Sequence, residues 1–80
     1  MPRNELTPES RKELSRRLLA AKKRSGVKNL TKAAKLYGVD PATAFRALHG
    51  VSSPSAATIV AMADMFNTTP GKMLDGLEVK

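Results

Sequence analysis

The side chains of this 80-residue chain that can do chemistry are mainly cations and hydrogen-bond donors, which favours binding over catalysis. The seven carboxylates are scattered at Glu5, Glu9, Glu13, Asp40, Asp64, Asp75 and Glu78. They suggest no paired acid and base, and the sequence has no Gly-rich phosphate loop. One histidine without any cysteine offers no convincing metal site. We therefore expect no enzymatic activity, no metal and no cofactor.

Positive charge is concentrated in the first part of the chain. Residues 1–50 hold 12 Lys and Arg against 4 Asp and Glu, a net charge of +8, whereas residues 51–80 hold 2 against 3, a net charge of −1. A surface that is only solvated mixes the two signs more evenly. The asymmetry therefore indicates a polyanionic partner. A membrane surface is a weaker alternative, because no expected helix pairs a basic face with a bulky aromatic one.

Residues 30–50 have the pattern of two short helices joined by one tight turn. Gly38 suits the left-handed backbone of such a turn, and Val39 can fill the angle between the helices. Asp40 offers a capping oxygen, and Pro41 fits the first position of the second helix. The segment therefore predicts a helix-turn-helix whose second helix presents one face outward.

The second helix of this motif carries side chains that could contact DNA, with Ala42, Phe45 and Arg46 on its free face. The guanidinium of Arg46 can bond guanine O6 and N7 as a bidentate pair, or it is solvated or contacts a phosphate. Phe45 either presses on a thymine methyl or folds back beside the small Ala44. Thr43 can donate to a phosphate or bond within its own helix. His49 can meet a phosphate or simply end the helix, where a cation suits the dipole.

Capping residues and glycines predict five helices, near residues 8–25, 30–37, 41–49, 54–66 and 70–75. Four starts are marked by a capping residue followed by proline, at Thr7-Pro8, Asp40-Pro41, Ser53-Pro54 and Thr69-Pro70. Asn29 caps the remaining helix. Eleven alanines and nine leucines against three aromatics favour an all-α fold over a sheet.

The apolar spacing predicts one core and one domain. Expected core positions are Leu14, Leu18, Ala21, Ile59, Met62, Ala63 and Phe66, with Leu74 and Leu77 closing one end. We expect a flexible arm over residues 1–7, the helix-turn-helix domain over 8–76 and a tail over 77–80. No apolar run approaches 18 residues and no leader pattern opens the chain, so a soluble, cytoplasmic protein is expected.

With the second and third helices forming the helix-turn-helix, residues 10–75 resemble the Cro/lambda-type repressor family, also called the XRE class. The resemblance rests on Gly38-Val39, on Ala42-Thr43 with Arg46-Ala47-Leu48, and on the segment around Ser53-Pro54. Leu30 departs from the family, which usually has a phosphate-contacting glutamine there. Residues 39–50 are also similar to the headpiece of LacI-type repressors, but a full helix precedes the motif here.

The resemblance implies a five-helix domain whose third helix enters the major groove of DNA. Pro41 and Ala42 would then make apolar base contacts at the amino end of that helix. The resemblance also places the start of the second helix, with Lys28, Asn29 and Lys32, against the DNA backbone. The other candidate phosphate contacts are Thr43 and His49 on the third helix, and Ser52 and Ser53 before the fourth, whose free N–H groups can hold a phosphate.

The predicted function is that of a sequence-specific transcriptional regulator, a Cro-like repressor that reads an operator in double-stranded DNA. Because one short helix reads few base pairs, a homodimer on a palindrome is expected. The alternatives are an antitoxin-type protein-interaction module with secondary DNA binding, and a nonspecific nucleic-acid binder. A nonspecific binder would need either basic residues without a shaped recognition helix or exposed stacking aromatics, for which Tyr37 and Phe45 are too few.

Overall fold

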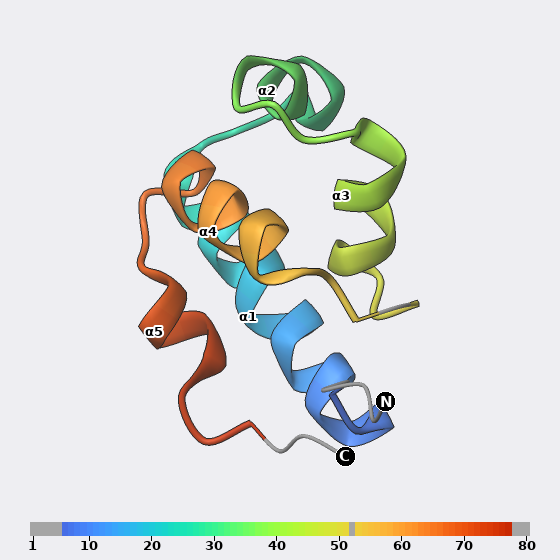
Figure 1. The fold of residues 1–80 in the computed structure, drawn as a ribbon. Coiled ribbons are helices and arrows are strands. Elements are labelled where there is room, and N and C mark those ends of the chain that lie inside the picture. The colour runs from blue at the N-terminus through green and yellow to red at the C-terminus, as the bar shows by residue number, and fades with distance from the viewer. Residues whose placement is uncertain (1–5, 52, 78–80) are drawn as a thin grey trace.

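The computed structural model describes residues 6–51 and 53–77, which form five helices joined by short turns (Figure 1). The helices are α1 (Pro8–Ser25), α2 (Leu30–Leu36), α3 (Pro41–Leu48), α4 (Ala56–Met65) and α5 (Pro70–Leu74). These residues contain no strand, so the all-α prediction is confirmed. Each helix end lies within two residues of its predicted position.

Side-chain caps explain where the helices begin. The side-chain oxygens of Thr7, Asn29, Asp40 and Thr69 accept a backbone N–H from the first turns of α1, α2, α3 and α5. A proline follows the cap in α1, α3 and α5, where its missing N–H costs no helical hydrogen bond. These four starts agree with the sequence prediction.

The start of α4 differs from its prediction. The helix begins at Ala56, and its cap is Ser55, whose Oγ accepts the N–H of Thr58 at 3.2 Å. The expected cap, Ser53, uses its Oγ to accept the N–H of Leu6 at 3.1 Å. Ser53-Pro54 therefore belongs to the loop before α4, because a contact with a distant segment occupies the capping oxygen.

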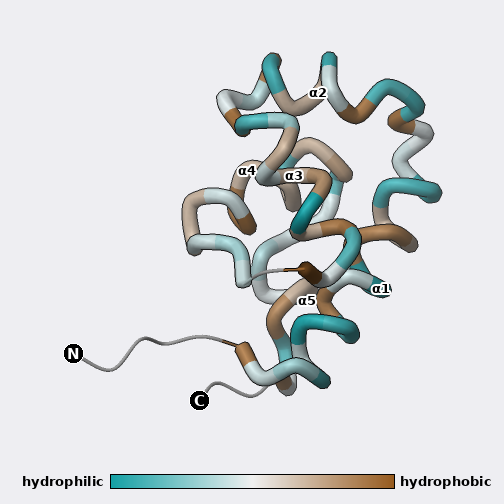
Figure 2. Tube along the Cα trace, turned by 90° about the vertical axis from the view of Figure 1, so that its right-hand side faces the viewer, coloured by the Kyte–Doolittle hydropathy of each residue, from teal (hydrophilic) through white to brown (hydrophobic). Residues whose placement is uncertain are grey.

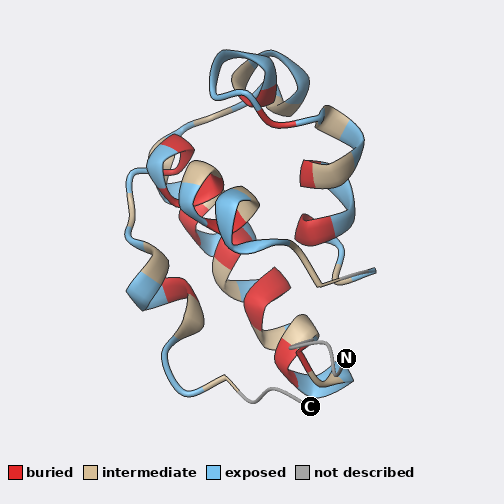
Figure 3. Ribbon diagram, viewed as in Figure 1, coloured by how far each residue is buried: buried red, intermediate tan, exposed pale blue. Residues whose placement is uncertain are grey.

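One hydrophobic core joins all five helices. Its largest fully buried side chains are Leu14 and Leu18 of α1, Met62 of α4, and Phe66 just after α4. The other expected core residues, Ala21, Ile59 and Ala63, are buried as well. Figure 3 shows the buried positions of α1 and α3 facing the interior of the bundle. Hydrophilic residues alternate with these apolar ones along α1 (Figure 2), as expected for a helix with one buried stripe.

The segment just before α1 packs against the rest of the domain. Leu6 is buried in the core, and its N–H is the one that Ser53 accepts. Thr7 is the cap of α1. Residues 6 and 7 of the predicted arm over residues 1–7 thus contact the domain, through the buried Leu6 side chain and the Thr7 cap. Residues 1–5 lie outside the described residues.

The expected residues Leu74 and Leu77 pack against the end of the core, but the most buried side chain there is Met73 of α5. Met73 is buried, whereas Leu74 and Leu77 are only partly buried against the core. Arg17 of α1 supports this end, since one of its guanidinium nitrogens donates to the backbone oxygens of Met73 at 3.1 Å and Asp75 at 2.7 Å. These bonds satisfy carbonyls that a helix end leaves free.

In the described ranges, no helix has the length and apolar character needed to cross a membrane.

Candidate nucleic-acid interface

The turn between α2 and α3 fixes how α3 is presented. Gly38 has a φ of 72°, which is left-handed, and the N–H of Val39 then donates to the oxygen of Ala34 at 2.8 Å. Ala34 and Val39 are both buried, so the turn is anchored in the core. The predicted roles of Gly38 and Val39 in this turn are confirmed.

Helix α3 has one buried face and one exposed face. Ala44, Ala47 and Leu48 are buried, and the hydroxyl of Ser15 on α1 donates to the backbone oxygen of Leu48. The exposed residues are Ala42, Phe45, Arg46 and His49. We call these four residues the α3 face. Small buried alanines let α3 lie close to its neighbours, so the α3 face is held by a packed helix.

Phe45 belongs to the surface. The residue is 56% exposed, and the centroid of its ring lies 4.2 Å from that of the His49 ring, with a 39° angle between the ring planes. The two residues are one turn apart, which brings their side chains together on a helix surface. Of the two alternatives for Phe45, the core position is wrong. The face therefore carries an exposed aromatic pair.

Arg46 is free to bind another molecule. In residues 6–51 and 53–77, its guanidinium has no hydrogen bond or ion-pair partner. The carboxylate nearest in sequence, Asp40, accepts from Ala42 N–H and from the Thr43 hydroxyl, both at 3.4 Å. An arginine without a carboxylate partner keeps all its donors for a ligand.

The remaining predicted residues of α3 are placed differently. Pro41 is partly buried at the first position of the helix, beside the exposed Ala42. Thr43 is partly buried and lines a hollow against Ala57 and Ala61 of α4. Its hydroxyl donates to the cap Asp40 instead of pointing out with Arg46. The structure therefore separates Thr43 from the α3 face.

The start of α2 brings three predicted phosphate contacts together. Lys28, Asn29 and Lys32 are all exposed. Asn29 Oδ1 accepts the N–H of Lys32 at 3.0 Å, which leaves its amide nitrogen for other partners. Leu30, the first residue of α2, is partly buried and packs against the core.

The two phosphate contacts predicted before α4, Ser52 and Ser53, are not found as exposed, free side chains in the described residues. Ser53 is partly buried and its oxygen accepts from Leu6, so its first role is to hold the segment before α1. Ser52 lies outside the described residues. The free N–H groups of α4 follow Ser55, which sequence reasoning missed because Ser53-Pro54 offered the stronger start signal.

Most of the ion pairing in the described residues lies on α1. Glu13 accepts from Arg16 at 2.5 Å and from Arg17 at 2.9 Å. The hydrogen bonds from Arg16 and then Arg17 lower the pKa of Glu13 from 4.5 to about 2, and Glu13 raises the pKa of Arg16. In the described part of the chain, these pairs involve no lysine of α2 and not Arg46 of α3.

Comparison of the chain with protein-family models, curated proteins and solved structures finds no match.

Proposed function

We propose that this chain is a sequence-specific double-stranded DNA-binding regulator of transcription that acts as a Cro-like repressor. The observation that supports this proposal most strongly is the composition of the α3 face. It combines an unpaired guanidinium at Arg46 with the exposed pair of Phe45 and His49. A helix exposed on one side and anchored on the other is what major-groove recognition requires.

The chemistry of the α3 face suggests what it reads. Arg46 can donate to guanine O6 and N7 together, because guanine presents two adjacent acceptors in the major groove, whereas adenine presents one acceptor and one donor. Phe45 and Ala42 have no side-chain donors, so they would contact thymine methyls. Lys28, Asn29 and Lys32 would hold the backbone and set the register without carrying sequence information. A homodimer would place two copies of α3 in successive major grooves, and repression would follow from occupying a promoter.

Selection of bound duplexes from a random DNA pool tests this proposal. The expected result is an enriched palindrome with guanines and thymines in each half-site. If each subunit contacts about three to five phosphates, log K should fall against log[salt] with a slope of about −5 to −9. A pool that stays random after repeated selection would refute sequence-specific binding. A slope near zero would refute the phosphate contacts.

A further inference from the structure

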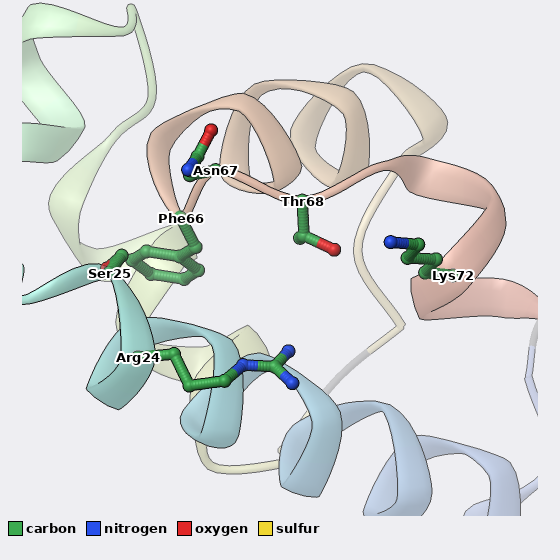
Figure 4. Close-up of a pocket in the computed structure, with 6 residues that line it drawn as sticks. All are labelled: Arg24, Ser25, Phe66, Asn67, Thr68 and Lys72. Atoms are coloured by element: carbon green, nitrogen blue, oxygen red, sulfur yellow. The ribbon is translucent and has the colours of Figure 1, made fainter.

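A second basic site lies away from α3. A hollow of about 310 Å³ between the end of α1 and the segment joining α4 to α5 is lined by Arg24, Ser25, Phe66, Asn67, Thr68 and Lys72. A neighbouring hollow of about 300 Å³ shares Arg24, Thr68 and Lys72 with it. Figure 4 shows these three side chains extending into the first hollow from different elements. We call the three residues the α1–α5 site.

The two cations of this site lack partners in the part of the chain that the structure describes. Arg24 and Lys72 make no side-chain hydrogen bond or ion pair there, and no carboxylate lines either hollow. Arg16 and Arg17, which line the neighbouring hollow, are instead occupied by Glu13. Two like charges beside one hollow repel each other, and a bound anion would relieve that repulsion.

The fold separates this site from the proposed DNA contacts. In Figure 1, α3 and α5 lie on opposite sides of the α1 and α4 pair. Arg24 lies in the last turn of α1, and Lys72 lies in α5. A duplex held by the α3 face would therefore leave the α1–α5 site open to another ligand.

We propose that Arg24, Thr68 and Lys72 form a binding site for phosphate groups, distinct from the α3 face. A guanidinium fork, an ammonium and a hydroxyl are donors that suit phosphate oxygens. Pockets for apolar small molecules are lined mainly by hydrophobic side chains, whereas these hollows are lined mainly by polar ones. The two adjoining hollows fit an anion with linked phosphates, either a small polyphosphate or the backbone of a second nucleic-acid segment.

Titration of the isotope-labelled full chain with inorganic pyrophosphate tests the site. Backbone amide signals of Arg24, Thr68 and Lys72 should shift on binding. The variant Arg24→Gln/Lys72→Gln should bind pyrophosphate about tenfold more weakly, since it loses two charge-assisted contacts. The control Lys12→Gln/Lys23→Gln removes the same charge from exposed α1 positions outside both hollows, and its affinity should change less than about twofold. Equal weakening in both variants would overturn the proposal.

A second arm identifies the source of the phosphate. The Arg46→Ala variant is titrated with a short duplex of random sequence and, separately, with pyrophosphate. If pyrophosphate shifts the amide signals of the α1–α5 site and the duplex does not, the natural ligand of the site is a small anion. Shifts with the duplex that pyrophosphate reverses support a second nucleic-acid contact. If neither ligand shifts these signals while the spectrum stays that of a folded protein, the site does not exist. DNA binding through α3 is unaffected by that outcome.

Discussion

Replacing Gly38 by valine should destabilise the turn that presents α3. Gly38 has a φ of 72°, and a Cβ atom added there meets nothing within 4 Å. The cost is therefore backbone strain without a steric clash. For a β-branched residue in the left-handed region, this strain should lower the free energy of unfolding by about 1–3 kcal/mol.

Two further variants separate strain from other effects of the substitution. Gly38→Asn should cost less than Gly38→Val, because asparagine adopts the left-handed region more readily. Gly71 lies in α5, also has no atom within 4 Å of an added Cβ, and does not have a positive φ. Gly71→Ala should therefore be neutral or stabilise the protein by about 0.4–1 kcal/mol.

Urea unfolding followed by the helical circular-dichroism signal measures all three variants. The predicted order of stability is Gly71→Ala, wild type, Gly38→Asn and then Gly38→Val. A Gly38→Val variant as stable as the wild type would refute the left-handed turn. An equal loss in Gly71→Ala would show that the strain argument is wrong.

Two other predictions concern Glu13 and Phe45. The pKa of Glu13 is depressed to about 2, so its bonds to Arg16 and Arg17 should stabilise the fold above pH 4.5, and this contribution should vanish as the pH falls from 4.5 to about 2. The stability difference between wild type and Glu13→Gln, measured by urea unfolding across this range, should shrink in the same window, and a difference independent of pH would contradict the pairing. For Phe45, replacing operator thymines by uracil should weaken wild-type binding by about 0.8 kcal/mol per contacted methyl. In Phe45→Ala the same replacement should have little effect, and an equal loss in both proteins would exclude contact between Phe45 and thymine.

Much of the fold could be predicted from local signals. Thr7-Pro8, Asp40-Pro41 and Thr69-Pro70 identify helix starts because the capping oxygen and the proline act within one turn. Ser53-Pro54 carries the same signal but lies in a loop, since Leu6 donates to Ser53 and Ser55 takes over the cap. That competition depends on a contact between distant segments, which local reasoning does not include.

The candidate site could be predicted only in part, because some of its features depend on local periodicity and others on tertiary packing. Helical periodicity places Arg46 opposite the buried Ala44 and Leu48, so its exposure follows from the sequence. Phe45 remained ambiguous, because an apolar ring suits either the core or a surface contact. That Arg24 and Lys72 line one hollow could not be anticipated, because only the packing of α5 beside α1 brings the two cations together.

Base readout by Arg46 is tested most directly by comparing specific with nonspecific DNA binding. Arg46→Ala and the charge-matched control Lys23→Ala, an exposed residue of α1, are titrated against the selected operator and a scrambled duplex. Arg46→Ala should lose about 1–3 kcal/mol per half-site on the operator and much less on the scrambled duplex. Its melting temperature should barely change, because the side chain is exposed and unpaired. Equal losses on both duplexes would contradict base readout by Arg46, and no loss on either would remove α3 from the DNA.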